Sequence, residues 1–379
     1  MKITFRIISV MTALSLFFAA ASGCGNAKNP DNTPQNSVSP SALVTAPPDQ
    51  TPSASSEPSP AFLSDTLMMT VSGEAVYWDE LKYWMFDILQ NAGLAQNESI
   101  DWSLMVEGIP MTDYLISEAV NAISLFRLVE LKCSELGVEL NDEDRASMDT
   151  FREDCIAQFQ SEAEYEAYLV QSNLTQALLE YMNMVAFLYN NLFVEMYGVY
   201  GEKLSSEDAV SFGNENNIFR AKHILISGLD EEGNALSDET IAANYNKLLG
   251  LLDQLNASDN PSALFDELMN THSEDPGVST YPNGYQYISG IMDPSFQSAV
   301  ESLSDYGISD IVKMPTYGYT IIMRLPLSPN EPIFADQNGS TLRYIAAATR
   351  FQTQLDAWLQ EMDIQYAPAF EKLNPEDWF

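Results

Sequence analysis

The sequence predicts an α+β fold in which a compact unit of strands and short helices is inserted between helical segments. Three observations support this prediction. Apolar residues recur at helical spacing through 67–217, the pattern changes to strands, turns and shorter helices in 218–327, and a helical pattern returns in 340–363. The chain has 379 residues, which leaves room for two domains with their own cores after the N-terminal stretch.

Residues 1–23 have the pattern of a secretory signal peptide. A basic start is followed by a short uncharged apolar run that ends in small residues. The sequence Ala21-Ser22-Gly23-Cys24 resembles the lipobox of bacterial lipoproteins, which implies that Cys24 becomes a lipidated N-terminus. We therefore expect an extracytoplasmic protein anchored by lipid to the outer face of a bacterial cell membrane. Ordinary secretion with an unmodified Cys24 is the alternative.

The composition of residues 24–66 predicts a disordered linker. Pro, Ser, Thr and Asn dominate this stretch, and aromatic residues are absent from 26–60. Such a segment buries too little apolar surface to offset its chain entropy, so it should stay extended. It would hold the folded part away from the membrane.

Charge and cysteine content exclude two classes of site. The formal net charge is −37, whereas nucleic-acid binding needs a basic surface, so nucleic acid is not an expected partner. Cys133 and Cys155 fall at positions on neighbouring predicted helices that do not face each other, so we expect free buried thiols. No CxxC motif or His/Cys cluster occurs, and we expect neither a metal nor a cofactor.

The N-terminal part reads as a series of helices. Helical patterns cover residues 81–89, 112–136, 141–159, 161–172 and 174–201. The last of these is apolar on almost every side. A helix of this kind is either wrapped by others or offers a binding surface, so residues 174–197 form core or a groove for client polypeptides.

The stretch IFRAKHILI, residues 218–226, predicts a strand because apolar residues occupy alternate positions. This alternation places His223 on the inward face with Ala221 and Leu225. Arg220 and Lys222 are then expected on the outward face. A buried imidazole needs a hydrogen-bond partner, so His223 is a candidate functional residue.

Four sequence stretches follow one another along the insert: AKHILIS (221–227), HSEDPG (272–277), NGYQYISGIMDPSFQSAVESL (283–303) and YGYTIIMRL (317–325). Together they resemble the parvulin (PpiC-type) peptidyl-prolyl isomerase domain. With the lipobox and the flanking helices, the whole chain resembles the PrsA-type foldase lipoproteins and the SurA-type chaperones. The resemblance implies a helical chaperone-like part at 67–217, a parvulin-like domain at 218–327, and a segment 328–379 whose helix packs on the helical part.

The resemblance also implies a polar site. His223 matches the first histidine of the family, and Asp275 matches the position beside the substrate carbonyl. Thr320 stands where the family has a second histidine. A hydroxyl can donate to or accept from an imidazole, which allows a catalytic network of His223, Asp275 and Thr320. Alternatively, His223 is a satisfied core residue and much of the activity is lost.

The resemblance places the proline ring of a substrate against Met292 and Phe296, with Tyr287 at an aromatic position of the same cup. Asp293 and Pro294 resemble the N-cap and first residue of a helix, which brings Met292 and Phe296 together. Rotation about an X–Pro bond must cross a barrier of about 18–20 kcal/mol. An enzyme lowers it by binding the twisted form best, which calls for an apolar cup and a dry polar network. Alternatively, these residues are simply core.

The implied activity is cis–trans isomerisation of X–Pro bonds in unfolded exported polypeptides. The loop after the first strand, SGLDEEGNALSDE (227–239), is acidic and would repel phosphate, so we expect unphosphorylated clients. One alternative is a non-catalytic holdase chaperone on a degenerate parvulin scaffold. Another is a solute-capturing lipoprotein of a transport system, which the lipobox and linker fit equally well.

Overall fold

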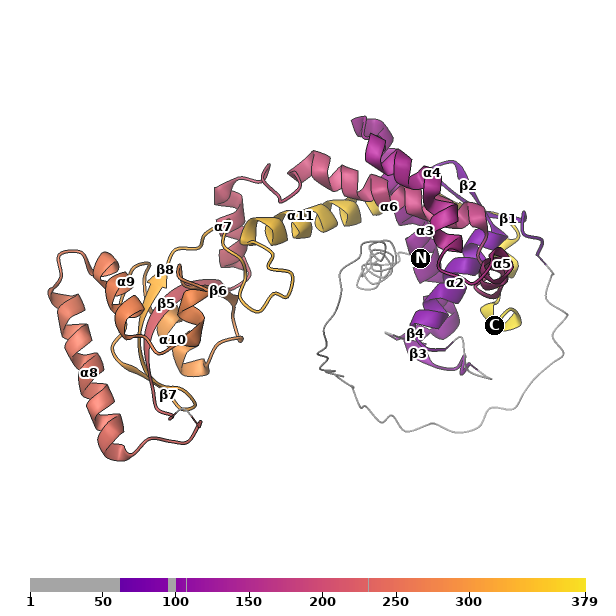
Figure 1. Cartoon of the computed structure of the whole chain (residues 1–379). Helices are drawn as coiled ribbons and strands as arrows, with labels where there is room; N and C mark the ends of the chain where they lie inside the picture. The colour runs from indigo at the N-terminus through magenta and orange to yellow at the C-terminus, as the bar shows by residue number, and fades with distance from the viewer. Residues whose placement is uncertain (1–61, 95–99, 107, 231) are drawn as a thin grey trace. The chain divides into compact units, whose positions relative to one another are not determined.

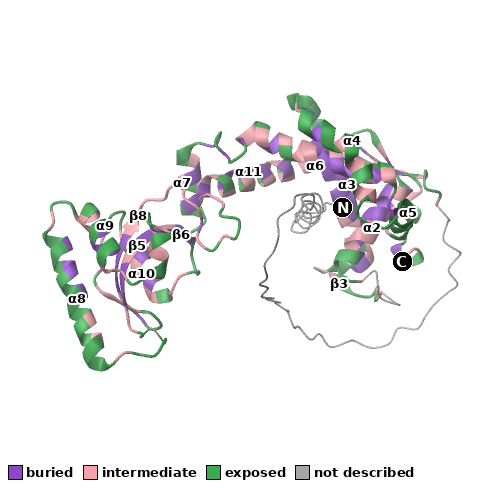
Figure 2. Cartoon of the chain, in the orientation of Figure 1, coloured by how far each residue is buried: buried purple, intermediate pink, exposed green. Residues whose placement is uncertain are grey.

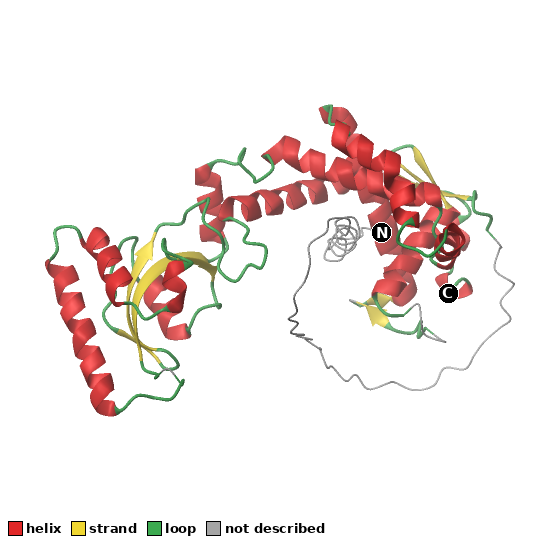
Figure 3. Ribbon diagram, in the orientation of Figure 1, coloured by secondary structure: helices red, strands yellow, loops and turns green. Residues whose placement is uncertain are grey.

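The computed structural model describes residues 62–94, 100–106, 108–230 and 232–379 (Figure 1). The predicted signal peptide, Cys24 and most of the predicted linker lie outside the described residues. The chain divides into two compact units. The first holds the described residues up to Leu192 together with Gln354–Phe379, and the second is Phe193–Thr353. Both helices and strands are abundant, which confirms the α+β prediction (Figure 3).

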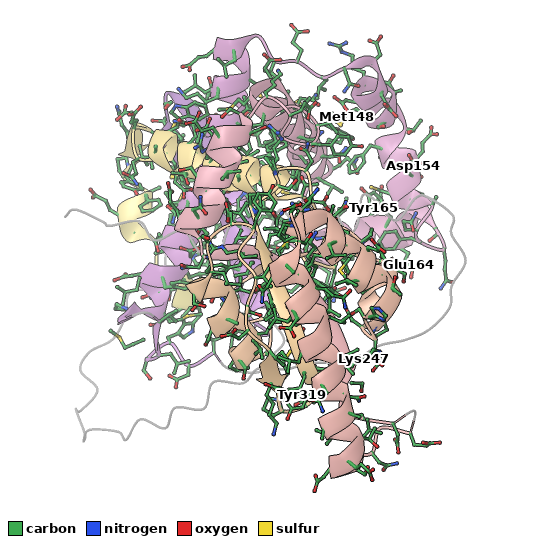
Figure 4. All side chains as sticks on the ribbon, turned by 90° about the vertical axis from the view of Figure 1, so that its left-hand side faces the viewer. Met148, Asp154, Glu164, Tyr165, Lys247 and Tyr319 are labelled. Carbon is green, nitrogen blue, oxygen red and sulfur yellow. The ribbon has the colours of Figure 1, made fainter. Side chains whose placement is uncertain are left out.

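The first unit is mainly helical. Its helices are α2 (Trp78–Asn91), α3 (Met111–Leu136), α4 (Asp142–Ile156), α5 (Glu162–Gln171) and most of α6 (Gln176–Tyr197). Helix α4 begins after Asn141, as expected, because the Asn141 side chain accepts from the backbone N–H groups of Glu143 and Asp144 at 2.9 and 3.0 Å. At the start of α6, the Gln176 side chain accepts from the Tyr165 hydroxyl of α5 at 2.5 Å (Tyr165 is labelled in Figure 4).

A small sheet joins the two ends of the described chain within the first unit. Strands β1 (Leu67–Val71) and β2 (Glu74–Tyr77) form a hairpin through a turn at Ser72 and Gly73, both of which have positive φ. Strand β9 (Ile364–Tyr366) pairs antiparallel with β1. A second hairpin consists of β3 (Met105–Val106) and β4 (Ile109–Pro110).

Residues 176–192 of α6 are largely covered. Only Ala177 and Asn190 are exposed in this stretch, and Met182 and Leu192 are fully buried or nearly so. This burial favours core packing over an open client groove for this part of the helix. No described helix combines the length and the apolar character needed to cross a membrane.

Neither Cys133 nor Cys155 forms a disulfide, as predicted, but Cys155 is only partly buried. Cys133 is buried in α3, and its thiol lies 3.5 Å from the carbonyl oxygen of Leu188. Burial, assisted by Glu130, raises the pKa of the Cys133 thiol to about 11. The thiolate is therefore scarce at neutral pH, which makes Cys133 a poor nucleophile.

The second unit is built on a four-stranded antiparallel sheet in the order β6-β5-β8-β7. The strands are β5 (Ile218–Ser227), β6 (Tyr285–Ile288), β7 (Val312–Met314) and β8 (Gly318–Leu325). Helices α8 (Asp238–Ala257) and α9 (Pro261–His272) cover one face, and α10 (Pro294–Ser302) covers the other (Figure 1). Helix α7 (Ser206–Glu215) precedes β5, and α11 (Leu342–Leu359) begins in this unit.

The position of β5 inside the sheet explains one wrong prediction. Strand β5 was expected to expose Lys222 on an outward face, but Lys222 is only 5% exposed. Helix α9 covers that face, and the Lys222 ammonium pairs with the carboxylate of Asp266. The same face carries Ile224 and Ile226, which pack against α8 and α9; the buried side of α8 is visible in Figure 2. Alternation gave the correct face for each residue, but covering helices bury both faces.

Helix α10 begins as the sequence predicts. The Asp293 carboxylate accepts from the backbone N–H groups of Ser295 at 2.8 Å and Phe296 at 3.4 Å, and Pro294 is the first helical residue. This cap fixes the position where Phe296 enters the core beneath β5.

Candidate functional site

His223 lies on the face of β5 that α10 covers. Its ring stands edge-on to the Phe296 ring, with centroids 5.3 Å apart and planes at 81°. Its Nε2 atom lies 3.5 Å from Oδ2 of Asp275, and Nδ1 is buried with no hydrogen-bond partner among the described residues. Burial lowers the pKa of His223 below its usual 6.5, although the charge of Asp275 opposes this shift. The imidazole is therefore neutral at pH 7.

Asp275 is fixed by the turn that follows α9. Its Oδ1 accepts from the backbone N–H of Gly277 at 3.0 Å, at the start of a short 3-10 turn, and its Oδ2 accepts from the Tyr285 hydroxyl at 2.7 Å. The preceding residues anchor this turn to β5. The N–H of Leu225 donates to the hydroxyl of Ser273 at 3.1 Å, and the N–H of Glu274 donates to the carbonyl of Leu225 at 2.8 Å.

Tyr285 is a site residue that the sequence analysis missed. It pairs with Ala221 across β6 and β5, and its ring lies 5.7 Å from the His223 ring. Burial and the hydrogen bond to Asp275 raise the pKa of Tyr285, so it donates as a neutral phenol. The alternation of Tyr285 with Tyr287 along β6 was the available signal, since it places both rings on one sheet face.

Thr320 lies on the same sheet face as His223 but does not contact the imidazole by a hydrogen bond. Thr320 pairs with Leu225, whereas Ile322 stands directly opposite His223. The Thr320 hydroxyl is fully buried and donates to the backbone carbonyl of Ile224 at 3.1 Å. The structure thus brings together His223, Asp275 and Tyr285, and it leaves the Thr320 hydroxyl bound to the backbone.

The three predicted cup residues lie in one apolar cluster. Phe296 and Tyr287 are buried with Ala221 and Leu225, and Met292 packs half-buried against them. Two further half-buried rings, Tyr281 and Phe334, border the same cluster. Buried rings at the base and half-exposed side chains around them give the apolar surroundings that a proline ring would need.

Gly277 allows the contact between Tyr285 and Asp275. A Cβ atom at position 277 would overlap the Tyr285 hydroxyl. We expect Gly277→Ala to displace Tyr285, to break its hydrogen bond to Asp275, and to lower the unfolding free energy of the second unit by about 1–3 kcal/mol. Denaturant unfolding followed by tyrosine fluorescence measures this loss.

Gly250→Ala is the matched control for this prediction. Gly250 lies in α8, and a Cβ atom there meets nothing within 4 Å. Since alanine is the better helix former, Gly250→Ala should stabilise the unit by about 0.5–1 kcal/mol. Equal effects of the two substitutions would contradict the tight approach of Tyr285 to Gly277.

The lowered pKa of His223 predicts a specific pH dependence of stability. The unfolded chain binds a proton at this histidine near pH 6.5, and the folded chain binds it only at lower pH. The contribution of neutral His223 to the unfolding free energy is therefore complete above pH 6.5. It is lost as the pH falls toward the folded-state pKa, with a slope of up to about 1.4 kcal/mol per pH unit. His223→Gln should remove this component. Unfolding free energies of both proteins, measured between pH 7.5 and about pH 5, should converge as the pH falls; a constant difference would contradict the prediction.

Among the described residues, no group of three or more His, Cys, Asp and Glu side chains is placed to hold a metal ion. The site itself offers a neutral imidazole, a carboxylate and a phenol beside an apolar surface. Such a group can orient and polarise a bound amide without breaking a bond.

Comparisons with known proteins gave matches among solved structures alone. No family model matches the chain, and no curated protein matches it. The PrsA peptidylprolyl isomerase of Bacillus anthracis is 18% identical, with 64% of this chain and 96% of that chain covered and a TM-score of 0.24. PrsA from Bacillus cereus is 13% identical, with 79% and 91% covered and a TM-score of 0.28.

The chain is also similar to a SurA-like chaperone of Campylobacter jejuni, with 10% identity, 80% of this chain and 99% of that chain covered, and a TM-score of 0.26. The chain is thus similar to solved structures of PrsA peptidylprolyl isomerases and of a SurA-like chaperone, which are the two groups that the sequence resembles.

Proposed function

We propose that this protein is an extracytoplasmic foldase that catalyses cis–trans isomerisation of X–Pro bonds. The observation that carries the proposal is the His223–Asp275–Tyr285 network, in which the imidazole is 11% and the carboxylate 13% exposed, and which lies against the apolar cluster of Met292 and Phe296. An apolar cup next to a dry polar network is the combination that selective binding of a twisted prolyl amide requires.

In this proposal the cup holds the proline ring and Asp275 faces the carbonyl that precedes it. Twisting the amide localises the nitrogen lone pair and reduces the negative charge on the carbonyl oxygen. A carboxylate near that oxygen therefore repels the planar amide more than the twisted one, which lowers the barrier. Tyr285 and the backbone of Gly277 hold Asp275 in place, and the neutral His223 ring supplies a polarisable wall.

The proposed clients are unphosphorylated, unfolded segments of exported polypeptides. In support, the loop between β5 and α8 is acidic, and hydrogen bonds from backbone N–H groups, the largest from Asn234, lower the pKa of Asp230 and keep it charged. A phosphate group would be repelled there. A lipid anchor at Cys24 is part of the same proposal, since it would place the protein where exported chains emerge.

A proline-isomerisation assay tests the proposal. Two short peptides are compared that differ only by phosphorylation of a Ser before proline. The wild-type chain should accelerate isomerisation of the unphosphorylated peptide, and the phosphorylated peptide should be the poorer substrate. Failure to accelerate either peptide would overturn the catalytic claim, and a preference for the phosphorylated peptide would overturn the client assignment.

A non-catalytic holdase is the second candidate, and two observations favour it. The Thr320 hydroxyl is engaged by the backbone rather than by His223. The first unit also exposes large apolar side chains, at Leu104, Met105, Ile109, Tyr168 and Val170. A holdase should suppress aggregation of an unfolded protein equally well when Asp275 is changed to Asn. Loss of suppression in Asp275→Asn would argue against this candidate.

A further inference from the structure

The segment that follows β8, residues 328–334, runs along the outer edge of β6, and we call it the strap. The backbone N–H of Phe334 donates to the carbonyl of Gln286 at 2.6 Å, and Ile333 forms a parallel bridge with Gln286. Strand β6 is the last strand of its sheet on this side. The strap therefore occupies backbone groups that an added client strand would otherwise pair with.

Side chains fix the strap in this position. The Gln286 amide is 1% exposed, and its Nε2 donates to the carbonyls of Ser328 at 3.1 Å and Glu331 at 3.0 Å, while its Oε1 accepts from the N–H of Ser328 at 2.8 Å. The Glu331 carboxylate accepts from Asn283 at 3.0 Å and lies 3.7 Å from Arg220. These contacts make the strap part of the second unit.

The strap ends by placing an aromatic ring beside the candidate site. Phe334 stands edge-on to Tyr281, at 5.4 Å and 83°, and to Tyr285, at 5.0 Å and 89°. Tyr285 is the residue that binds Asp275 and adjoins His223. One ring thus separates Phe334 from the polar network, and Phe334 and Tyr281 are both only half-buried.

We propose that Phe334, together with Tyr281, forms an aromatic wall that selects the side chain next to the substrate proline and favours an aromatic residue there. This inference rests on the proposed function of the same site. Adjacent residues of an extended peptide are about 3.8 Å apart, so a proline held against Met292 and Phe296 brings its neighbours within reach of the wall. Because the strap blocks the edge of β6, recognition depends on side chains rather than on strand pairing.

The test compares wild type, Phe334→Ala and Phe334→Leu in the full chain, with unphosphorylated peptides that carry Phe or Ala on either side of one proline. Both kcat/KM for isomerisation and Kd by calorimetry are measured. Wild type should prefer the Phe-flanked peptide. Phe334→Ala should reduce that preference by about 2- to 12-fold, the equivalent of one aromatic pair. Phe334→Leu keeps an apolar side chain but lacks the ring, so it should also reduce the preference for the Phe-flanked peptide.

Tyr319→Ala is the matched control. Tyr319 is another half-buried ring of the second unit, edge-on to Tyr245 at 5.4 Å and 78°, but it packs against the cluster on the opposite sheet face (Tyr319 is labelled in Figure 4). Its removal should leave the Phe/Ala preference unchanged. An unchanged preference in both Phe334 variants would overturn the inference while leaving an active isomerase. A wild type that binds with this preference but does not isomerise would overturn the proposed function alone, and the absence of peptide binding would overturn both.

Discussion

Asp275→Asn is expected to lower kcat/KM for X–Pro isomerisation by about 100-fold, the usual cost of removing one electrostatic group from a desolvated site. The substitution keeps the shape of the side chain but removes its charge. The amide oxygen still accepts from the N–H of Gly277, so the turn after α9 should persist. The proposed advantage for the twisted amide should be lost, because it depends on a negative charge beside the carbonyl.

Asp305→Asn is the control for this substitution. Asp305 lies in the same unit, is half-exposed, and has an ion pair with Arg324 at 3.5 Å. A surface pair of this kind contributes at most about 1 kcal/mol to stability, and its loss should leave kcat/KM within about twofold of wild type. If Asp275→Asn and Asp305→Asn behave alike while both remain folded, Asp275 has no special role in the reaction.

Arg127→Met is expected to destabilise the first unit by about 3–5 kcal/mol, because it leaves a buried carboxylate without its cation. Arg127 in α3 binds Glu80 of α2 at 2.7 Å, and both side chains are nearly buried. The guanidinium also donates to the Tyr181 hydroxyl of α6 and lies 4.7 Å from that ring. Burial raises the pKa of Glu80 while the charge of Arg127 opposes the rise.

Tryptophan fluorescence measures the unfolding of the first unit selectively, since all five tryptophans of the chain lie in that unit. The double variant Arg127→Met, Glu80→Met removes both charges and should recover most of the loss. Arg145→Met, which breaks exposed pairs with Glu139 and Asp142, should cost less than about 1 kcal/mol. A double variant no more stable than Arg127→Met would show that Arg127 acts through packing rather than charge.

Local signals predicted the helices and the strand of His223 well. Caps at Asn141 and Asp293 lie where the sequence places them, because a cap depends on residues within one helical turn. The burial of Lys222 could not be predicted in this way. It depends on α9, whose position over β5 is a property of the assembled sheet rather than of the strand.

The candidate site was predicted in part. The resemblance brought His223, Asp275 and Phe296 together, and they lie close in the structure. Alternation along β6 places Tyr285 on the same face as Tyr287, but its hydrogen bond to Asp275 depends on the room that Gly277 leaves, which the alternation does not reveal. Phe334 was missed for a related reason. The loop after β8 returns to the site through contacts with Gln286, a residue that is distant from the loop in sequence.

The hydrogen bonds of Gln286 have a practical consequence for how the second unit can be cut from the chain. A fragment that ends at residue 327 would leave a buried amide with three unmet bonds and an open strand edge, a combination that promotes misfolding and aggregation in a recombinant fragment. Since Ile333 bonds Ser340 and Pro332 bridges to Thr341, a soluble fragment should extend at least to residue 341. The C-terminal boundary of the smallest soluble fragment is therefore set by Gln286 in β6 and not by the end of β8.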